Sequence, residues 1–498
     1  MSLKFRFPTP YTVLMIVIAI AAVATWLLPS GNYDALVYNA ADDVFEITSV
    51  DGDTTIPASQ AALDEMGILI AIEKFKEGKI NKPISVPDTY TEVPSEPQGI
   101  AEVIFAPIKG MYEVVDIVLF VLIIGGFIGV FNSSGAFDQG IGYLANKLQG
   151  RESLLIILVT SLIAVGGTTF GMQEETLAFY PILVPVFLAA GYDLIVPVAV
   201  IYIGSCIGIM GGTINPFGTI IASDAAGVNW TIGFYSRLAM LLIGAAASIT
   251  YIVRYANRVK KDPTKSFLYG LGLKSPFSKV EEGKKVEKLS LATKALLTLF
   301  GTTFLVMIYG VSVLGWWFEE MTALFLVAAI LMGVLQRVGE RDFVKDFISG
   351  AEDLLGVSLI IGIARGVTVI LNEGQVSDTI LFYAANAVDG MSGIVFLPSL
   401  MAVFFIMALF ISSSSGMAVV TMPIMSSLAQ VIGVPQEEIV NAYLFGFGLM
   451  NFITPTGLIL PSLAMVNVNY NTWLKFMWPL MSILAVIAIA ILWVGLWV

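Results

Sequence analysis

The chain has 498 residues, of which 57% are hydrophobic and 13% are charged, whereas about a quarter of the residues are charged in a soluble domain. It contains one cysteine, Cys206, and no histidine, which excludes an internal disulfide, a histidine-ligated zinc or haem site and a Ser-His catalytic pair. The composition therefore predicts a multi-pass membrane protein that is neither an enzyme nor a nucleic-acid-binding protein, and the net charge of −12 indicates no particular partner.

Apolar stretches near the ~20-residue length that crosses a lipid bilayer recur along the chain. The clearest stretches cover residues 11–28, 114–131, 238–255, 295–313, 323–334, 354–371, 394–411 and 476–498. The first follows Lys4 and Arg6, as in a signal peptide, but it has no small-residue cleavage site before Pro29. We therefore predict that residues 1–30 form a retained N-terminal transmembrane helix.

Residues 31–113 interrupt the hydrophobic pattern. They contain five aspartates before residue 54, and Glu92 and Glu96 follow among prolines. We expect short strands, loops and one amphipathic helix over 59–79. Because Lys4 and Arg6 favour a cytoplasmic N-terminus, the positive-inside rule places this segment outside the cell membrane.

Basic residues gather in three further places, which the same rule assigns to the cytoplasm. They are Lys147 with Arg151, a group of lysines and arginines in the loop 257–290, and the segment 337–345. By contrast, residues 366–474 contain no lysine or arginine. This distribution predicts a protein of the bacterial inner membrane with a cytoplasmic N-terminus and an extracytoplasmic C-terminus.

An internal repeat relates residues 114–256 to residues 352–498. Three residues of the first half recur in the second with identical spacing: Asn132, Asp138 and Gly150 are matched by Asn372, Asp378 and Gly390. Further along, Pro216-x-Gly218 is matched by Pro455-x-Gly457. Residues 257–290 then form a cytoplasmic loop, and 291–351 form linking transmembrane helices between the halves.

The two halves run in opposite directions through the membrane. The loop that follows Asn132 is basic, whereas the loop that follows Asn372 is acidic only. Two inverted repeats are typical of carriers that work by alternating access. The alternative is that two apolar halves match by chance.

Each half has a Gly/Ser/Thr-rich segment between apolar arms. Residues 166–176 provide it in the first half and residues 412–417 in the second. Such a turn exposes backbone N–H and C=O groups at membrane depth, which is tolerated only beside a cavity. We therefore predict two re-entrant hairpins.

Each half also has a proline-containing break in an apolar helix, at residues 211–219 and 451–457. Proline donates no hydrogen bond and disfavours helix in the residue before it, so the helix should unwind there. The freed carbonyls and Asn/Thr oxygens suit Na⁺, and the N-terminus of a half-helix suits a carboxylate. Paired breaks in inverted halves point to the transport site. The alternative is that these prolines and glycines only shape the helices.

These paired tips and breaks resemble the ion transporter superfamily, which includes the dicarboxylate/sodium symporters of the INDY type. More closely, residues 29–33, 171–175 and 350–366 resemble the YfcC-type branch of the C4-dicarboxylate anaerobic carrier (DcuC) family. The resemblance covers essentially the whole chain. It implies an all-α polytopic fold with two inverted-topology repeats, re-entrant hairpins and broken helices, in which a transport domain moves as an elevator against the scaffold of a homodimer.

The resemblance also implies the positions of the site residues, because one hairpin and one break per half hold the substrate and Na⁺ in that superfamily. The substrate-binding residues that match are Thr168, Thr169, Thr213, Asn215, Ser413, Ser414, Asn451, Thr454 and Thr456. The expected Na⁺ ligands are Gly167, Gly212, Asn215, Ser415 and Thr454. The INDY-type tripeptide Ser-Asn-Thr is absent from both tips, so its recognition of two carboxylates does not carry over.

Glu174 and Glu175 occur in the first half only, since Ala418 and Val419 stand near the matching place. Carboxylates at membrane depth are costly and usually face a cavity or a partner. These two could bind a substrate ammonium group, take part in Na⁺ or H⁺ coupling, or pair with Arg365.

The sequence thus predicts a secondary active transporter of a small carboxylate-bearing solute across the bilayer. It would be coupled to a cation, with Na⁺ favoured over H⁺, or would work as an exchanger, and it needs no other cofactor. An amino acid, basic ones of the arginine or ornithine type included, is favoured because two ionised glutamates would repel a dicarboxylate. The alternatives are a C4-dicarboxylate or short-chain carboxylate carrier and, third, a channel.

Overall fold

The computed structural model of the chain describes residues 9–78, 80, 82–136, 139–140, 143, 152–273, 289–314 and 316–497. Within these ranges the protein is mostly helical, and nine of the described helices are long and apolar enough to cross a membrane. They are α1 (Pro10–Leu27), α5 (Val115–Ser133), α7 (Glu152–Phe170), α12 (Phe234–Lys261), α13 (Leu291–Leu314), α14 (Phe318–Gln336), α15 (Glu340–Glu373), α18 (Ser414–Ile432) and α21 (Tyr470–Gly495). The prediction of an all-α polytopic membrane protein is confirmed at this level.

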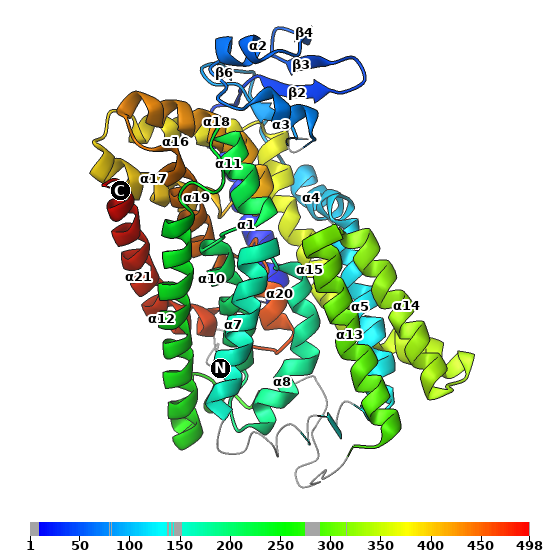
Figure 1. Cartoon of the computed structure of the whole chain (residues 1–498). Coiled ribbons are helices and arrows are strands. Elements are labelled where there is room, and N and C mark those ends of the chain that lie inside the picture. Colours follow the sequence, from blue (N-terminus) through cyan, green and yellow to red (C-terminus); the bar gives the residue numbers. More distant parts are fainter. Residues whose placement is uncertain are drawn as a thin grey trace, which may run out of the picture.

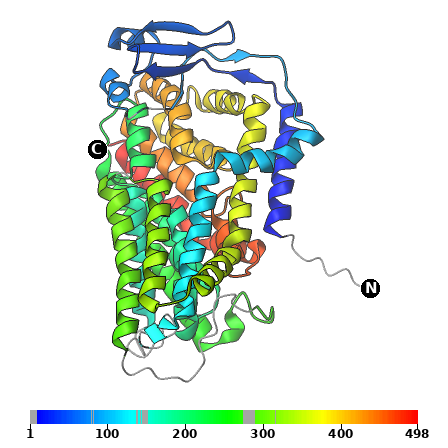
Figure 2. The ribbon, with the colours of Figure 1, turned by 90° about the vertical axis from the view of Figure 1, so that its right-hand side faces the viewer.

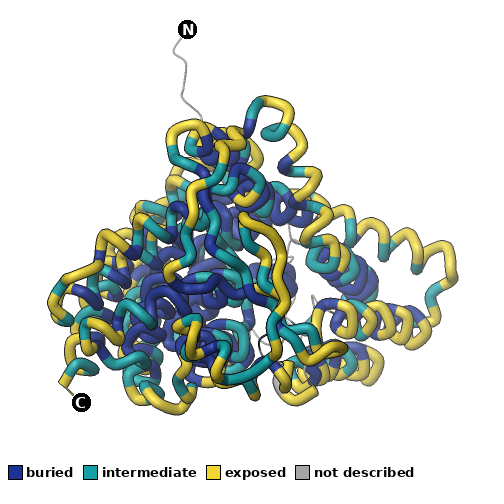
Figure 3. Tube along the Cα trace, turned by 90° about the horizontal axis from the view of Figure 1, so that it is seen from above, coloured by how far each residue is buried: buried dark blue, intermediate teal, exposed yellow. Residues whose placement is uncertain are grey.

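Shorter helical segments complete the helical part of the described chain outside residues 31–92. They are α4 (Ile100–Glu113), η1 (Glu174–Phe179), α8 (Tyr180–Ala189), α9 (Ile195–Val198), η2 (Ala199–Ile203), α10 (Gly204–Met210), η3 (Pro216–Ile220), α11 (Ile221–Ala225), η4 (Pro263–Lys265), α16 (Ser377–Val388), α17 (Gly393–Met407), α19 (Gln436–Asn451) and α20 (Ile459–Ala464). The helices α9, η2 and α10 follow one another without a gap, and they and α19 are buried over nearly their whole length. Viewed from above, the buried residues occupy the middle of the molecule and the exposed ones its outer helices (Figure 3).

Close packing of glycines joins α15 to α5 and α4. Gly350 of α15 faces Gly125 and Gly129 of α5 so closely that a Cβ on any of the three would overlap the opposite backbone. Further along α15, a Cβ on Gly366 would meet the backbone of Ala106 in α4. Small residues allow helix backbones to approach in this way within a membrane. The glycines of the 350–366 block therefore have a packing role.

Residues 31–92 form a small subdomain that lies as a layer across one end of the helices (Figures 1 and 2). Its main sheet has the order β4-β3-β2-β5, and β1 pairs with β6. The strands are β1 (Gly31–Asn32), β2 (Ala35–Asn39), β3 (Val44–Thr48), β4 (Thr54–Pro57), β5 (Ile84–Ser85) and β6 (Thr91–Glu92), all paired antiparallel. The short strands expected in this segment are present.

The single amphipathic helix predicted over 59–79 is wrong. The structure has two short helices, α2 (Gln60–Glu65) and α3 (Ile72–Lys76). Gly67 ends the first with a left-handed backbone (φ +68°), and Ile68 N–H donates to Leu63 O over 2.9 Å. This is the glycine-dependent stop of a Schellman motif, which overrides the apolar periodicity that continues past it.

The subdomain is bonded to helices on two sides. On one side it contacts the junction of α15 and α16, where Gly31 N–H donates to Gln375 O and Tyr33 N–H to Asp378 Oδ2. On the other side Lys74 Nζ lies 2.8 Å from Oδ1 of the buried Asp224 in α11. Subdomain residues, Asp88 among them, and Ser427 of α18 also line a cavity of about 370 Å³. The subdomain therefore bridges two groups of helices.

Several predictions concern residues outside the described ranges. They are the basic residues Lys4, Arg6, Lys147 and Arg151, part of the loop 257–290, and the repeat positions Asp138 and Gly150.

Candidate functional site

A cavity of about 290 Å³ lies where the predicted hairpin tips and helix breaks of the two halves meet. A single buried water needs only ~10–15 Å³, so the space suits a small organic solute. Polar and charged residues from seven separate chain segments line it: Lys82, Glu113, Asp116, Gln173, Glu174, Glu175, Asn215, Arg365, Ser412, Ser413, Ser414, Ser415 and Thr456. The apolar part of the wall includes Phe217, Trp317 and Phe318.

In the first half the chain leaves helical geometry at residues 211–215, where the break was predicted. Pro216 restarts the helix as η3, and Asn215 caps this start: its Oδ1 accepts from Phe217 N–H at 2.9 Å and from Gly218 N–H at 3.2 Å. A side-chain oxygen at this position satisfies donors that a helix start would otherwise leave free.

The end of α7 packs directly on this break. Thr168 Oγ1 donates to Gly211 O over 2.7 Å and accepts from Thr213 N–H at 2.9 Å. Gly171 follows with a left-handed backbone (φ +72°), and a Cβ there would meet the Asn215 side chain at 2.8 Å. Only glycine fits this approach, so the end of α7 and the break form one unit.

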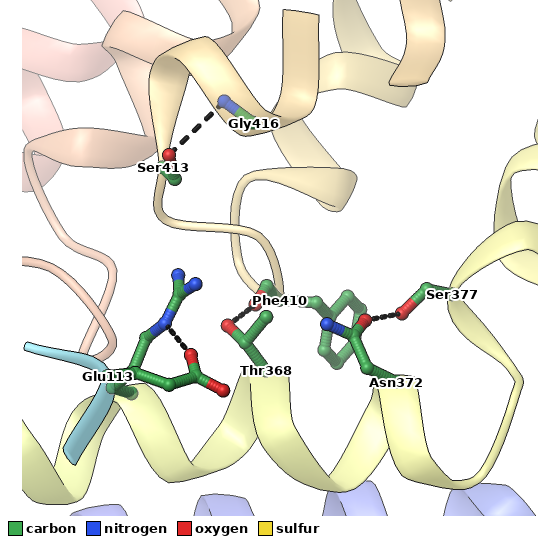
Figure 4. Close-up of polar contacts among 8 residues, drawn as sticks. Glu113, Thr368, Asn372, Ser377, Phe410, Ser413 and Gly416 are labelled. Carbon is green, nitrogen blue, oxygen red and sulfur yellow. Dashed lines mark hydrogen bonds and ion pairs between the residues drawn. The ribbon is translucent and has the colours of Figure 1, made fainter. Parts of the chain in front are cut away.

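In the second half Ser413 caps α18, its Oγ accepting from Gly416 N–H at 3.2 Å. Figure 4 shows this tip on one side of the site and the helix that carries Thr368 on the other, with Thr368 Oγ1 donating to Phe410 O. Residues 452–458 separate α19 from α20, which is the second break. There Thr454 and Thr456 share a hydroxyl–hydroxyl hydrogen bond of 2.7 Å, and Thr456 also donates to Leu409 O.

Charged side chains of both signs face the cavity. The carboxylates are Glu113, Asp116, Glu174 and Glu175, and the cations are Lys82 and Arg365. Arg365 Nε lies 2.6 Å from Glu113 Oε2, so the partner of this arginine is Glu113 and not Glu174 or Glu175 (Figure 4). Glu175 is buried, and its Oε2 accepts from Gln173 N–H at 3.0 Å.

The structure brings some of the predicted site residues to the cavity and leaves others behind it. Those that line it are Glu174, Glu175, Asn215, Ser413, Ser414, Ser415 and Thr456. Those that do not are Gly167, Thr168, Thr169, Gly212, Thr213, Asn451 and Thr454. The second set supports the first: the Thr169 hydroxyl donates within α7 to Val165 O, and Gly212 O accepts from Thr219 Oγ1.

Two lining residues could not be found from the sequence. Glu113 is the last residue of the polar segment 31–113, and Lys82 lies in the subdomain 31–92, far in sequence from every predicted motif. Lys82 Nζ donates to Ser415 Oγ over 2.8 Å across 333 residues of sequence. This ammonium group opposes a Na⁺ ion at Ser415, one of the predicted ligands, because the two charges have the same sign.

Comparisons with known proteins cover nearly the whole chain. The family described as "C4-dicarboxylate anaerobic carrier" (DcuC) matches residues 7–496. An uncharacterized protein of Haemophilus influenzae is 42% identical over 97% of this chain and 96% of its own length. The Escherichia coli (strain K12) protein named "Putative basic amino acid antiporter YfcC" is 28% identical over 97% of this chain and 95% of its own length.

Two solved structures are also similar to the chain. The Alcanivorax borkumensis YdaH transporter matches with a TM-score of 0.40 and 15% identity, over 98% of each chain. Neisseria gonorrhoeae MtrF, described with a class of antimetabolite efflux pumps, matches with a TM-score of 0.39 and 16% identity, over 100% of this chain and 96% of its own.

Proposed function

Because the chain belongs to the C4-dicarboxylate anaerobic carrier family, we propose that it is a secondary active transporter for a small carboxylate-bearing solute. Membership of a carrier family makes it a multi-pass membrane transporter and not an enzyme, as its sequence predicts. The resemblance to the YfcC-type branch is confirmed by the relative from Escherichia coli, which aligns along the whole chain.

The proposed mechanism is alternating access between two inverted repeats, 114–256 and 352–498. The order of the elements supports this division. In each half a Gly/Ser/Thr segment is followed by a helix, then by a buried helix that ends at a break, and then by a long helix, α12 or α21. The cavity that both halves line is the expected place for the solute in such a carrier. A channel would not need this pairing of breaks within one chain.

An amino acid is the proposed solute, and the observation that carries this proposal is the mixture of charges in one cavity. Four carboxylates and two cations line it, and one carboxylate already pairs with Arg365. A solute with an ammonium and a carboxylate group matches such a site, whereas a dicarboxylate meets an excess of negative charge. The name of the Escherichia coli relative points the same way, towards basic amino acids.

A C4-dicarboxylate remains the second candidate, since the family description favours it. Neutralisation of Glu174 or Glu175 by a proton or by Na⁺ would then be required.

The proposal also includes how the transporter works. Transport is coupled to Na⁺ rather than H⁺, or occurs by exchange. The transport domain moves as an elevator within a homodimer in the bacterial inner membrane. The C-terminus lies towards the end that carries the subdomain, which supports an extracytoplasmic C-terminus (Figure 1).

A ligand screen on the purified full-length protein tests this function. Basic amino acids, C4-dicarboxylates and short monocarboxylates are each added with and without Na⁺, and the melting temperature is recorded. A ligand that binds only the folded state raises it. Ligands that stabilise the protein are then measured for uptake into proteoliposomes. We expect saturable uptake of a basic amino acid; uptake of C4-dicarboxylates alone would favour the second candidate, and no saturable uptake would contradict both.

A further inference from the structure

One lysine of the subdomain 31–92 reaches the central cavity. Lys82 lies between α3 and β5, outside the two proposed repeats, yet its ammonium group contacts Ser415 in the first turn of α18. The two atoms are 2.8 Å apart, and both residues line the cavity together with Glu174 and Glu175. The subdomain therefore contributes a charged side chain to the candidate site.

Lys82 differs from its neighbours in having no carboxylate partner. Lys74 pairs with Asp224 at 2.8 Å, and Lys76 pairs with Asp43 at 3.1 Å. In the part of the chain that the structure describes, Lys82 forms no ion pair, and its hydrogen-bond acceptor is a neutral hydroxyl. The other cation of the cavity, Arg365, is already paired with Glu113.

The surroundings of Lys82 favour an incoming anion. Partial burial, and to a smaller extent the nearby Arg365, lower the pKa of its ammonium group below the ordinary range. A carboxylate would relieve both effects, and a charge-assisted hydrogen bond is roughly twice as strong as one to a neutral acceptor. The start of α18 adds backbone N–H groups and a partial positive charge next to the same position.

We propose that Lys82 binds the carboxylate of the transported solute and exchanges its Ser415 hydroxyl partner for it. This assignment rests on the proposed function and adds the subdomain to the site that selects the solute. The ammonium end of an amino acid would then face Glu174 and Glu175, which line the same cavity. Recognition of the two ends of the solute is thereby divided between the subdomain and the first hairpin.

The test compares solutes that differ only in a carboxylate. Binding of L-arginine and of its decarboxylated analogue agmatine, and of succinate and butanoate, is measured for the full-length protein and for the variants K82Q, S415A and K76Q. K82Q removes the charge but keeps a donor, whereas S415A removes the hydroxyl partner and keeps the charge. K76Q is the matched control, because Lys76 belongs to a surface pair.

We expect K82Q to weaken binding of the solute that carries the extra carboxylate by about 10- to 100-fold, the effect of losing a hydrogen bond to a charged group. Binding of agmatine, which has no carboxylate, should stay the same, so the ratio of the affinities for arginine and agmatine should fall towards one. S415A should preserve this ratio even if it changes the two affinities. K76Q should leave both affinities unchanged.

Three results would overturn the assignment. An affinity ratio in K82Q equal to that of the unmodified protein would exclude a carboxylate contact. Equal losses for arginine and agmatine in K82Q and in S415A would mean that Lys82 only holds the start of α18 in place. An unmodified protein that binds none of the four solutes would contradict the proposed function and this assignment together. The melting temperature without ligand checks that each variant is folded.

Discussion

The proposal that the solute is an amino acid depends on Glu174 and Glu175. If they bind the ammonium group of an amino acid, changing each in turn to glutamine should abolish uptake of L-arginine, since an amide offers no charge to a cation. Uptake into proteoliposomes measures this. Glu340→Gln at the exposed start of α15 is the control, because that residue does not line the cavity.

Folding of both variants is checked by gel filtration in detergent. Unchanged uptake kinetics in E174Q and E175Q would remove the glutamates from the site and favour a dicarboxylate. Loss of succinate uptake, with no uptake of arginine in the unmodified protein, would give them a role in cation coupling instead.

A second prediction concerns the ion pair between Lys74 and Asp224. The Asp224 carboxylate is almost completely buried, and Lys74 is its ion-pair partner in the described part of the chain. Removing one partner of a buried pair leaves an uncompensated charge, so Lys74→Met should destabilise the protein by about 3 kcal/mol. Thermal unfolding in detergent measures this change.

Two further variants identify the cause. The double variant K74M/D224N should recover most of the lost melting temperature, because neither charge is then left alone. Lys76→Met, which breaks an exposed pair with Asp43, should change the melting temperature little. Equal losses from K74M and K76M would show that burial of Asp224 is not what matters.

The limits of sequence interpretation are clearest for single residues. The break at Asn215 and the serine tip at Ser413 could be predicted, because proline and the Gly/Ser/Thr run act on their own neighbours. Lys82 and Glu113 could not, since their roles come from contacts with residues hundreds of positions away. Arg365 stands out in the sequence as an arginine within an apolar stretch, but its partner Glu113 is set by the packing of α4 on α15, which no local pattern encodes.

At the level of helices, the crossing of α5 and α15 makes a direct prediction. Gly350→Val would drive a side chain into the backbone at Gly125, so we expect a large loss of folded protein. Gly301→Val in α13 is the control, because nothing lies within 4 Å of a Cβ at that position. Fluorescence gel filtration of membrane extracts compares the two.

If Gly350→Val and Gly301→Val give equal amounts of folded protein, α5 and α15 can separate without a loss of stability, and the packing argument is wrong. In the sequence, Gly350 stands out only as part of the block 350–366 that resembles the YfcC-type branch. The spacing of the glycines in that block is compatible with close helix packing, but it does not predict which helix they contact.

Two long helices are missing from the apolar stretches that the sequence predicts. The helices α7 and α18 each have 19 residues, yet the sequence indicates only the Gly/Ser/Thr-rich segments at their ends. Their polar ends explain the difference: Gly, Ser and Thr lower the hydropathy of the segment, but tertiary contacts keep it helical. Thr168 bonds to Gly211 O, and Tyr443 OH donates to Ser414 O at the start of α18.

For the whole molecule, the proposed elevator movement can be tested at the second cavity. Asp88 of the subdomain and Ser427 of α18 both line it. The double variant Asp88→Cys/Ser427→Cys, linked by a bifunctional thiol reagent, should lose transport if α18 moves past the subdomain in each cycle. Reduction of a cleavable linker should restore it.

Reaction of the thiol reagent with the native cysteine should be low, because Cys206 is buried. Each single cysteine variant, treated in the same way, controls for simple modification. Full transport by completely cross-linked protein would mean that the subdomain and α18 move together or not at all, and the elevator would have to divide the molecule elsewhere.

The bridging position of the subdomain also sets an order of events during synthesis. Residues 31–92 leave the ribosome early, yet they bond to Gln375, Asp378 and Ser427, which come about 350 residues after their partners. At ~5–20 residues per second, this part of the chain waits roughly 18–70 s for its partners. The β-layer therefore completes its assembly among the last parts of the protein, and the cell must protect it outside the membrane until α15–α18 have been inserted.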